Sequence, residues 1–105
     1  MRFSKYKAVK TIVDGFIFAS KLEAKYYRIY SAMENAGMIK NLKMQTSLPF
    51  IFEGKKIFTY KPDFEFDDQD GKHHYIDVKG VSTPLFRLKK KLIEAQYKIE
   101  IEIVK

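Results

Sequence analysis

Two carboxylates and one ammonium group near the middle of the chain have the types and spacing for joint chemistry. They belong to Pro62-Asp63 and to Asp77-Val78-Lys79, which follows one predicted hairpin later. Alternate side chains of a strand share a face, so Asp77 and Lys79 project together while Val78 points to the opposite, buried side. If the strand that holds Asp63 pairs antiparallel with this one, both carboxylates can reach one shared ion.

Two carboxylates this close repel each other, and a hard divalent cation makes their coexistence favourable. Mg²⁺ takes oxygen ligands and keeps several waters. Such an ion polarises a phosphodiester and lowers the pKa of a bound water, while the ammonium of Lys79 orients that water or neutralises developing negative charge. The pattern therefore predicts a metal site with Mg²⁺ or Mn²⁺ as the cofactor, and phosphodiester hydrolysis as its chemistry.

The composition is that of a small folded protein with a basic surface. The 105 residues hold 20 Lys and Arg against 13 Asp and Glu, a formal net charge of +7, and 46% of them are hydrophobic. A disordered tail would be poor in hydrophobic side chains, so we expect a single domain over residues 1–105. The excess positive charge favours nucleic acid as the partner, because neutralising phosphates releases counterions.

The chain lacks cysteine, which excludes disulfides, cysteine-ligated metal centres and thiol nucleophiles. No apolar run approaches the roughly 20 residues that cross a bilayer, and the start of the chain lacks the apolar stretch of a secretory signal. We therefore expect a cytoplasmic, intracellular protein with no membrane partner. We also expect no small-molecule cofactor.

The first predicted elements are a hairpin and a helix. Asp14-Gly15 between short runs of β-formers predicts a hairpin over 11–18, because both loop residues tolerate positive φ. Ser20-Lys21-Leu22-Glu23 matches a capping box that starts a helix, and Gly37 is placed to end it. The helix is expected to bury one apolar stripe, formed by Leu22, Tyr26, Ile29, Tyr30 and Met33.

Strand-like segments and a second helix complete the chain. The segments before that helix are 42–52, which Pro49 interrupts, 57–60, 63–66 and 73–79. Thr83-Pro84 predicts a helix to about Tyr97, with a buried stripe of Leu85, Leu88, Leu92 and Ala95. Residues 99–105 alternate as a last strand. We therefore predict an α/β (α+β) fold: an N-terminal hairpin, then helix, three strands, helix and strand, with a mixed sheet flanked by two helices.

Three segments resemble the PD-(D/E)XK nuclease superfamily, and they are Phe18 to Glu23, Tyr60 to Phe64 and Tyr75 to Gly80. More narrowly, they resemble small phage-type endonucleases of the Holliday-junction-resolvase-like kind. The similarity spans about residues 6–91. It implies a restriction-endonuclease-like core of order α-β-β-β-α-β, and a setting such as a phage-infected bacterial cell.

The resemblance also implies roles residue by residue. Asp63 and Asp77 correspond to the two acids that ligate the metal, with help from the Val78 carbonyl. Lys79 corresponds to the lysine that positions the attacking water. Glu23 corresponds to an acid on the first helix that completes the metal shell, directly or through water. The second acid is Asp here, where Glu is commoner in the superfamily.

Some of these residues also have plainer interpretations. Capping explains Glu23 fully, and Asp63 and Asp77 could be ordinary surface acids paired with neighbouring lysines. Gln45 is a further candidate, because some relatives carry a polar active-site residue on the strand before the motif. No zinc site is expected at the adjacent histidines 73 and 74, which face opposite ways on a strand, with no cysteine or third histidine beside them.

Basic residues at two places are candidates for DNA binding. The basic N-terminal arm, residues 1–10, contributes Lys5, Lys7 and Lys10, and the second helix contributes Arg87, Lys90 and Lys91. Each group could track a phosphate backbone or could be a solvated surface.

The favoured hypothesis is a divalent-metal-dependent DNA endonuclease that hydrolyses phosphodiester bonds. It would be selective for branched DNA, in the manner of a Holliday junction resolvase, and act in recombination, repair or phage DNA processing. Small resolvases of the resembled kind work as pairs, so we expect a homodimer. Two alternatives stay open: a basic nucleic-acid-binding module or degenerate nuclease accessory subunit without catalysis, and a structural phage protein that binds only proteins.

Overall fold

The computed structural model describes residues 10–105, so the predicted arm with Lys5 and Lys7 lies outside the described residues. In chain order the elements are β1 (Thr11–Val13), β2 (Phe16–Phe18), α1 (Lys21–Asn35), β3 (Lys40–Met44), β4 (Leu48–Phe52), β5 (Lys55–Tyr60), β6 (Phe64–Asp67), β7 (His73–Val78), α2 (Pro84–Tyr97) and β8 (Ile101–Val104). The architecture is mixed α+β, as predicted, and it starts with the predicted hairpin.

The central sheet has the order β3-β6-β7-β8 and is mixed. Its β3-β6 and β6-β7 pairs are antiparallel, whereas β7 and β8 run parallel. The parallel pair requires a crossover, and α2 supplies it. Taken without the β4-β5 hairpin, the chain follows the predicted order of helix, three strands, helix and strand.

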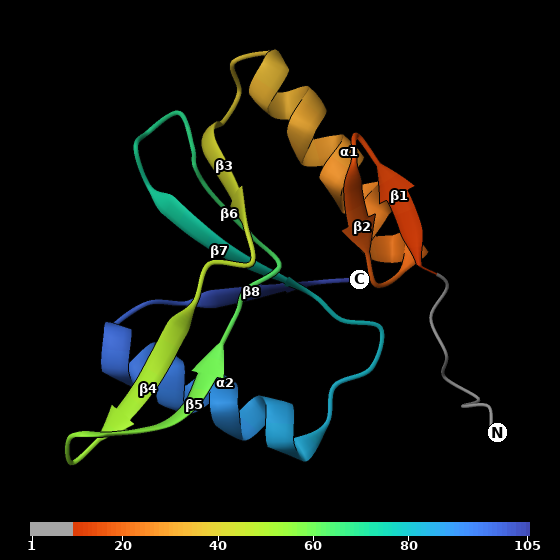
Figure 1. Cartoon of the computed structure of the whole chain (residues 1–105). Helices are drawn as coiled ribbons and strands as arrows, with labels where there is room; N and C mark the ends of the chain where they lie inside the picture. The colour runs from red at the N-terminus through yellow and green to blue at the C-terminus, as the bar shows by residue number, and fades with distance from the viewer. Residues whose placement is uncertain (1–9) are drawn as a thin grey trace, which may run out of the picture.

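The two faces of the sheet are covered by different elements. On one face α1 and the β1-β2 hairpin enclose a core that includes Tyr30, Phe64 and Ile76. On the other face α2 and the β4-β5 hairpin enclose a second core, centred on Tyr60, Ile93 and Ile101. Figure 1 shows the two groups of elements at opposite sides of the sheet. Side chains that alternate along β6 and β7 therefore enter different cores.

Local signals position the first hairpin and the first helix as predicted. Asp14 and Gly15 have φ of 53° and 82°, which is the left-handed backbone that a two-residue hairpin loop requires. Ser20 caps α1, and its hydroxyl oxygen accepts the backbone N–H of Glu23 at 3.1 Å. The carboxylate of Glu23 accepts from the Ser20 hydroxyl at 3.3 Å, so the pair is held locally.

Residues 42–52, predicted as one strand-like segment, are divided between two sheets. The segment was expected to be interrupted at Pro49, but the chain leaves the sheet earlier, after β3, where Gln45 has a φ of 58°. Residues 48–60 form a separate two-stranded hairpin. Pro49 lies in β4, where a missing N–H costs little, and its carbonyl accepts from Gln96 at 2.8 Å and Tyr97 at 2.6 Å. These bonds fasten the hairpin to α2.

The predicted buried stripe of α1 was wrong in part. Ile29 is exposed, and the buried residues are Ala24, Tyr27 and Tyr30. The face is rotated because the β1-β2 hairpin packs against the helix as well as the sheet. The ring of Tyr27 lies 5.1 Å from that of Phe18 on β2, centroid to centroid.

The predicted buried stripe of α2 was also wrong. Leu85 and Leu88 are 60% and 54% exposed, and Ala95 is exposed, while Leu92 is half-buried. Ile93 is fully buried instead, with Phe86 and Tyr97 packed around the same core. Both sets of residues have helical spacing, so the choice between them depends on the hydrogen bonds that fix α2 to the β4-β5 hairpin.

We predict that Ile93→Ala lowers the free energy of unfolding by about 3 kcal/mol, because it leaves a cavity in the core under α2. Leu88→Ala, on the opposite face of the same helix, should change it by less than about 0.5 kcal/mol. Urea unfolding monitored by circular dichroism measures both. Equal losses for the two variants would contradict the observed orientation of α2.

Candidate active site

Strand β7 carries Asp77 into the molecule beside α2. The side chain is 3% exposed, and its Oδ2 accepts a hydrogen bond from the hydroxyl of Tyr60, the last residue of β5. The ammonium nitrogen of Lys79 lies 4.0 Å from Asp77 Oδ1 and 4.4 Å from the ring centroid of Phe86. Asp77 is therefore buried and held by a hydrogen bond beside an ammonium group, unlike a carboxylate in an ordinary surface ion pair.

Asp63 reaches the same place from the loop that precedes β6. Its Oδ2 accepts the backbone N–H of Val78 at 2.7 Å, and its Oδ1 accepts from Gln45 Nε2 at 3.3 Å. The bond to the Val78 N–H takes the place of a backbone hydrogen bond that the β6-β7 pairing would otherwise make there. The acid is consequently fixed to the strand that holds Asp77.

Pro62 leaves the backbone carbonyl of Val78 without a hydrogen-bond donor from the neighbouring chain segment. Phe64 pairs with Ile76, so continuing the register by two residues sets Pro62 opposite Val78. The N–H and C=O of one strand residue point to the same neighbouring strand, and proline has no N–H to donate. The ladder thus gives the Val78 carbonyl no donor from residue 62, on the side where Asp63 binds the Val78 N–H.

The pKa of Asp63 is strongly raised. Burial, together with a hydrogen bond between the two carboxyl groups, raises the pKa of Asp63 to about 8, and the charge of Glu23 adds to the shift. The Val78 N–H opposes it. Burial and the bond to Asp77 also raise the pKa of the Tyr60 phenol. Without a cation, Asp63 therefore keeps its proton at neutral pH.

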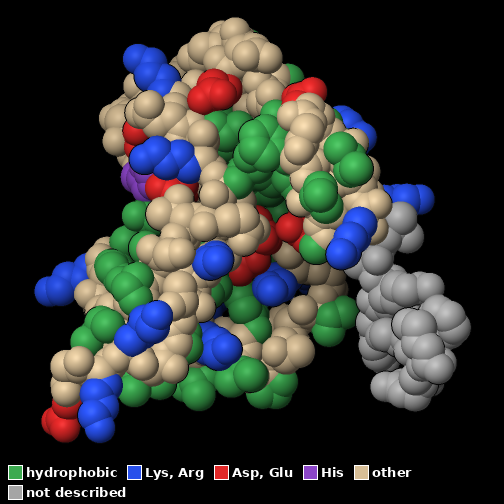
Figure 2. Space-filling model, viewed as in Figure 1, with side chains coloured by type: hydrophobic (Ala, Val, Ile, Leu, Met, Phe, Trp, Pro, Cys, Tyr) green, Lys and Arg blue, Asp and Glu red, His purple; other side chains and the backbone are tan. Residues whose placement is uncertain are grey.

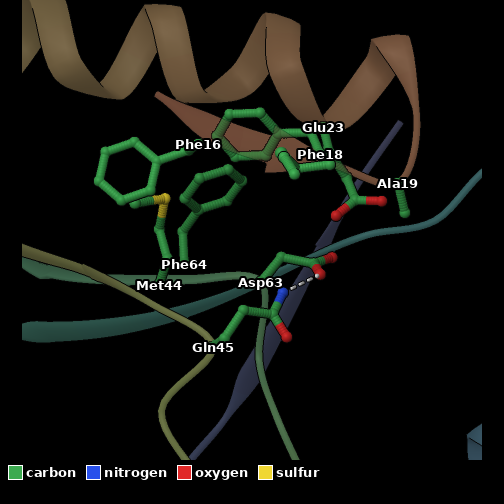
Figure 3. Close-up of a pocket in the computed structure, with 9 residues that line it drawn as sticks. Phe16, Phe18, Ala19, Glu23, Met44, Gln45, Asp63 and Phe64 are labelled. Atoms are coloured by element: carbon green, nitrogen blue, oxygen red, sulfur yellow. Dashed lines mark hydrogen bonds between the residues drawn. The ribbon is translucent and has the colours of Figure 1, made fainter. Parts of the chain in front are cut away.

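Asp63 lies at the boundary of two cavities. The smaller, about 320 Å³, contains Tyr60, Asp77 and Lys79, and is rimmed by Lys61 and Lys89. The larger, about 460 Å³, contains Asp63 together with Glu23, Gln45 and several apolar side chains. Figure 3 shows the carboxylates of Glu23 and Asp63 on one side of this larger cavity.

The site is acidic at its centre and basic around it. Figure 2 shows acidic side chains in a hollow near the middle of one face, with Lys and Arg side chains around it. Sequence reasoning gave no functional role to Tyr60 or Lys61, and it noted Lys89 only as a neighbour of the basic residues on the second helix. Tyr60 and Lys61 stand directly before Pro62-Asp63, so their proximity was available from the sequence, but the inward direction of the Tyr60 hydroxyl was not.

The predicted DNA-binding residues are spread over other surfaces. Lys10 and Lys91 are exposed. Arg87 donates to the Ser82 carbonyl at 3.2 Å, and Lys90 forms an ion pair with Glu94 at 2.9 Å. The three predicted DNA-binding residues of α2 line a cavity beside Ile103 on β8, whereas Lys89 of the same helix lines the cavity that contains Asp63 and Asp77.

The two histidines on β7 bind carboxylates on opposite faces of the sheet. Each ring lies between two acids, and the pairs are Glu65 with Asp67 for His73, and Asp68 with Glu102 for His74. The hydrogen bond to Asp68 raises the pKa of His74. Both histidines thus join neighbouring strands at the end of the sheet that carries the β6-β7 turn.

Side chains alone do not form a complete metal cage at the two acids. Over the described range, 10–105, no group of three or more His, Cys, Asp or Glu side chains is arranged to hold a metal ion. Glu23 contributes its charge to the larger cavity and keeps its bond to Ser20. Two carboxylates plus one carbonyl are nevertheless a donor set that suits Mg²⁺, which retains several waters.

The comparisons with known proteins identify a family. A family model described as a protein of unknown function (DUF1064) matches residues 3–104. The chain belongs to the DUF1064 family. No curated protein and no solved structure matches this DUF1064 chain significantly. In the part of the chain that the structure describes, no helix is both long and apolar enough to cross a membrane.

We predict that Asp63→Asn stabilises the metal-free protein at alkaline pH. The folded-state pKa of Asp63 is raised from 3.8 to about 8, so the wild type loses stability as the pH rises through that window. Asparagine carries no charge there and can still accept the Val78 N–H. At pH 9 in EDTA, the free energy of unfolding should rise by about 2 kcal/mol, and at pH 4 it should change little.

Urea unfolding at the two pH values measures this difference. Asp70→Asn is the matched control, because Asp70 is exposed in the β6-β7 turn and should show no pH-dependent gain. A loss of stability in Asp63→Asn at pH 9 would contradict the raised pKa of Asp63.

Proposed function

We propose that this DUF1064 protein is a divalent-metal-dependent DNA endonuclease of the PD-(D/E)XK kind. The observation that carries the proposal is the convergence of Asp63, Asp77 and Lys79 in one cavity. A buried acid, a second acid bonded to the same strand, and an ammonium group 4.0 Å from the first are costly to assemble. Groups arranged at such a cost are typical of functional sites.

The residues present fit a hard divalent cation. Asp63, Asp77 and the Val78 carbonyl would hold it, and Glu23 would bind through water. When bound, Mg²⁺ or Mn²⁺ supplies positive charge that polarises the phosphodiester and lowers the pKa of a bound water. Two features support the fit: the raised pKa of Asp63, and the β6-β7 register, which when continued by two residues sets Pro62 opposite Val78.

The side chains around the acids have distinct tasks. The Tyr60 hydroxyl orients Asp77, and the Val78 N–H orients Asp63. Lys79, held against the Phe86 ring, donates to the attacking water and offsets the negative charge that develops on the phosphate. Water displaces the 3′ oxygen directly, so no bond forms between the enzyme and the DNA.

Binding of DNA depends on the basic rim and not on the acids. Lys61 and Lys89 border the cavity, and the whole chain carries a net charge of +7. Long-range attraction brings the phosphate backbone to the site, and it weakens with added salt. Branched DNA is the proposed substrate and a homodimer the proposed assembly, on the resemblance to small junction-cleaving endonucleases.

We predict that Asp77→Ala and Lys79→Ala each reduce Mg²⁺-dependent cleavage of branched DNA by at least about 100-fold, because each removes a group that acts in the transition state. Binding in Ca²⁺ should remain within about threefold, since the rim lysines stay in place. Single-turnover cleavage and fluorescence anisotropy, on a panel of branched and linear substrates, measure the two quantities.

Asp70→Ala and Lys72→Ala are matched controls, because both residues are exposed in the β6-β7 turn, away from the cavity. Both control variants should cleave as the wild type does. Full cleavage by Asp77→Ala would refute the assigned site. Salt-sensitive DNA binding by a wild type that cleaves no substrate with any metal would instead favour the non-catalytic binding module.

A further inference from the structure

The larger cavity next to Asp63 has a lining that hydrolysis does not require. Its volume is about 460 Å³, within the range of small-ligand sites. Figure 3 shows Phe16 and Met44 together at one end, with Phe64 beside them. The opposite end holds Glu23, Gln45 and Asp63. The cavity thus has an apolar end and a polar end, and the polar end is part of the acid cluster.

The aromatic end combines a fixed floor with an accessible ring. Phe64 is 1% exposed and belongs to the core under α1, whereas Phe16 is 46% exposed. Phe16 is placed by the tight Asp14-Gly15 turn, and its ring centroid lies 5.6 Å from that of Tyr27. A planar group can therefore lie against Phe16 without displacing the core.

The polar end selects a neutral group over an anionic one. Glu23 and Asp63 both present acidic groups to the cavity, so a second phosphate or carboxylate is disfavoured there. Gln45 adds a carboxamide, which can both donate and accept hydrogen bonds. The left-handed backbone at Gln45, with a φ of 58°, is uncommon for a residue other than glycine, and Nε2 of this amide donates to Asp63 Oδ1 at 3.3 Å.

We propose that this cavity accepts the unpaired nucleobase of the nucleotide beside the cleaved phosphate. The inference rests on the proposed nuclease function. A phosphate bound next to Asp63 is joined through one sugar to the base of the same nucleotide. The two cavities that meet at Asp63 therefore match the phosphate and the base of one nucleotide. The base lies on Phe16, and Gln45 contacts its hydrogen-bonding edge.

Selectivity for DNA structure follows from this occupancy. A paired base in a regular duplex is stacked, and removing it from the stack costs a few kcal/mol. Bases at branch points, mismatches and single-stranded flaps have already lost part of that stacking. The protein therefore cleaves next to bases that leave the duplex easily, whatever their sequence.

Removal of single bases from the DNA tests the proposal with the wild-type protein. A series of branched substrates carries one abasic residue at each position around the cleaved bond, and kcat/KM is measured in Mg²⁺. One position should lower kcat/KM by about tenfold, because base stacking on an aromatic ring is lost there. Neighbouring positions should change it by less than about threefold.

A protein variant then connects that position to the cavity. Phe16→Ala should lower kcat/KM on intact DNA by about tenfold and should remove the additional penalty of the abasic residue. Phe52→Ala is the matched control, since Phe52 is 60% exposed on β4 and does not line the cavity. It should leave both quantities unchanged.

Binding of 2-aminopurine DNA in Ca²⁺ decides the matter independently of cleavage. With 2-aminopurine placed at each position in turn, the fluorescence at one position should change on binding to the wild type and not on binding to Phe16→Ala. Cleavage without any sensitive abasic position would overturn the cavity assignment and leave the nuclease proposal intact. Failure to cleave any substrate would overturn the nuclease proposal, and an unchanged 2-aminopurine signal at every position would then overturn the cavity assignment too.

Discussion

The contact between the carboxyl groups of Asp63 and Asp77 is the constraint on which the arrangement of this molecule depends. Like charges in a buried place oppose folding. In this fold a backbone N–H, a phenol and a carboxamide donate hydrogen bonds to the two acids. Those three groups come from β7, β5 and the end of β3. Separate parts of the chain thus meet because one electrostatic conflict has to be contained.

Charges of opposite sign occupy different parts of the site, with the acids at its centre and the lysines at its rim. Lysines around the hollow act over a distance and attract any polyanion, whereas the acids act at contact and repel a bare phosphate. A proton or a cation at the acids would reduce that repulsion. Long-range attraction and close-range repulsion are therefore properties of different residues.

Much of the local structure, but less of the packing, could be predicted from the sequence. The Asp14-Gly15 turn, the Ser20 cap and the shared face of Asp77 and Lys79 depend on neighbours in the chain, and all three were predicted. The buried face of α2 was predicted wrongly, because two residue sets have equal helical spacing and the hydrogen bonds that Pro49 accepts decide between them. Tyr60 was missed because its role depends on the direction in which a separate hairpin leaves the sheet.

The β4-β5 hairpin has different sensitivities at its two ends. Its free end, the Glu53-Gly54 turn, is exposed and touches none of the acids, whereas its attached end terminates in Tyr60, bonded to Asp77. Insertions at residues 53–54 can alter how far this arm extends without disturbing the bond between Tyr60 and Asp77. A one-residue deletion within β5 would instead shift the register and turn the phenol away. Sequence changes should thus be tolerated at the Glu53-Gly54 turn and constrained near Tyr60.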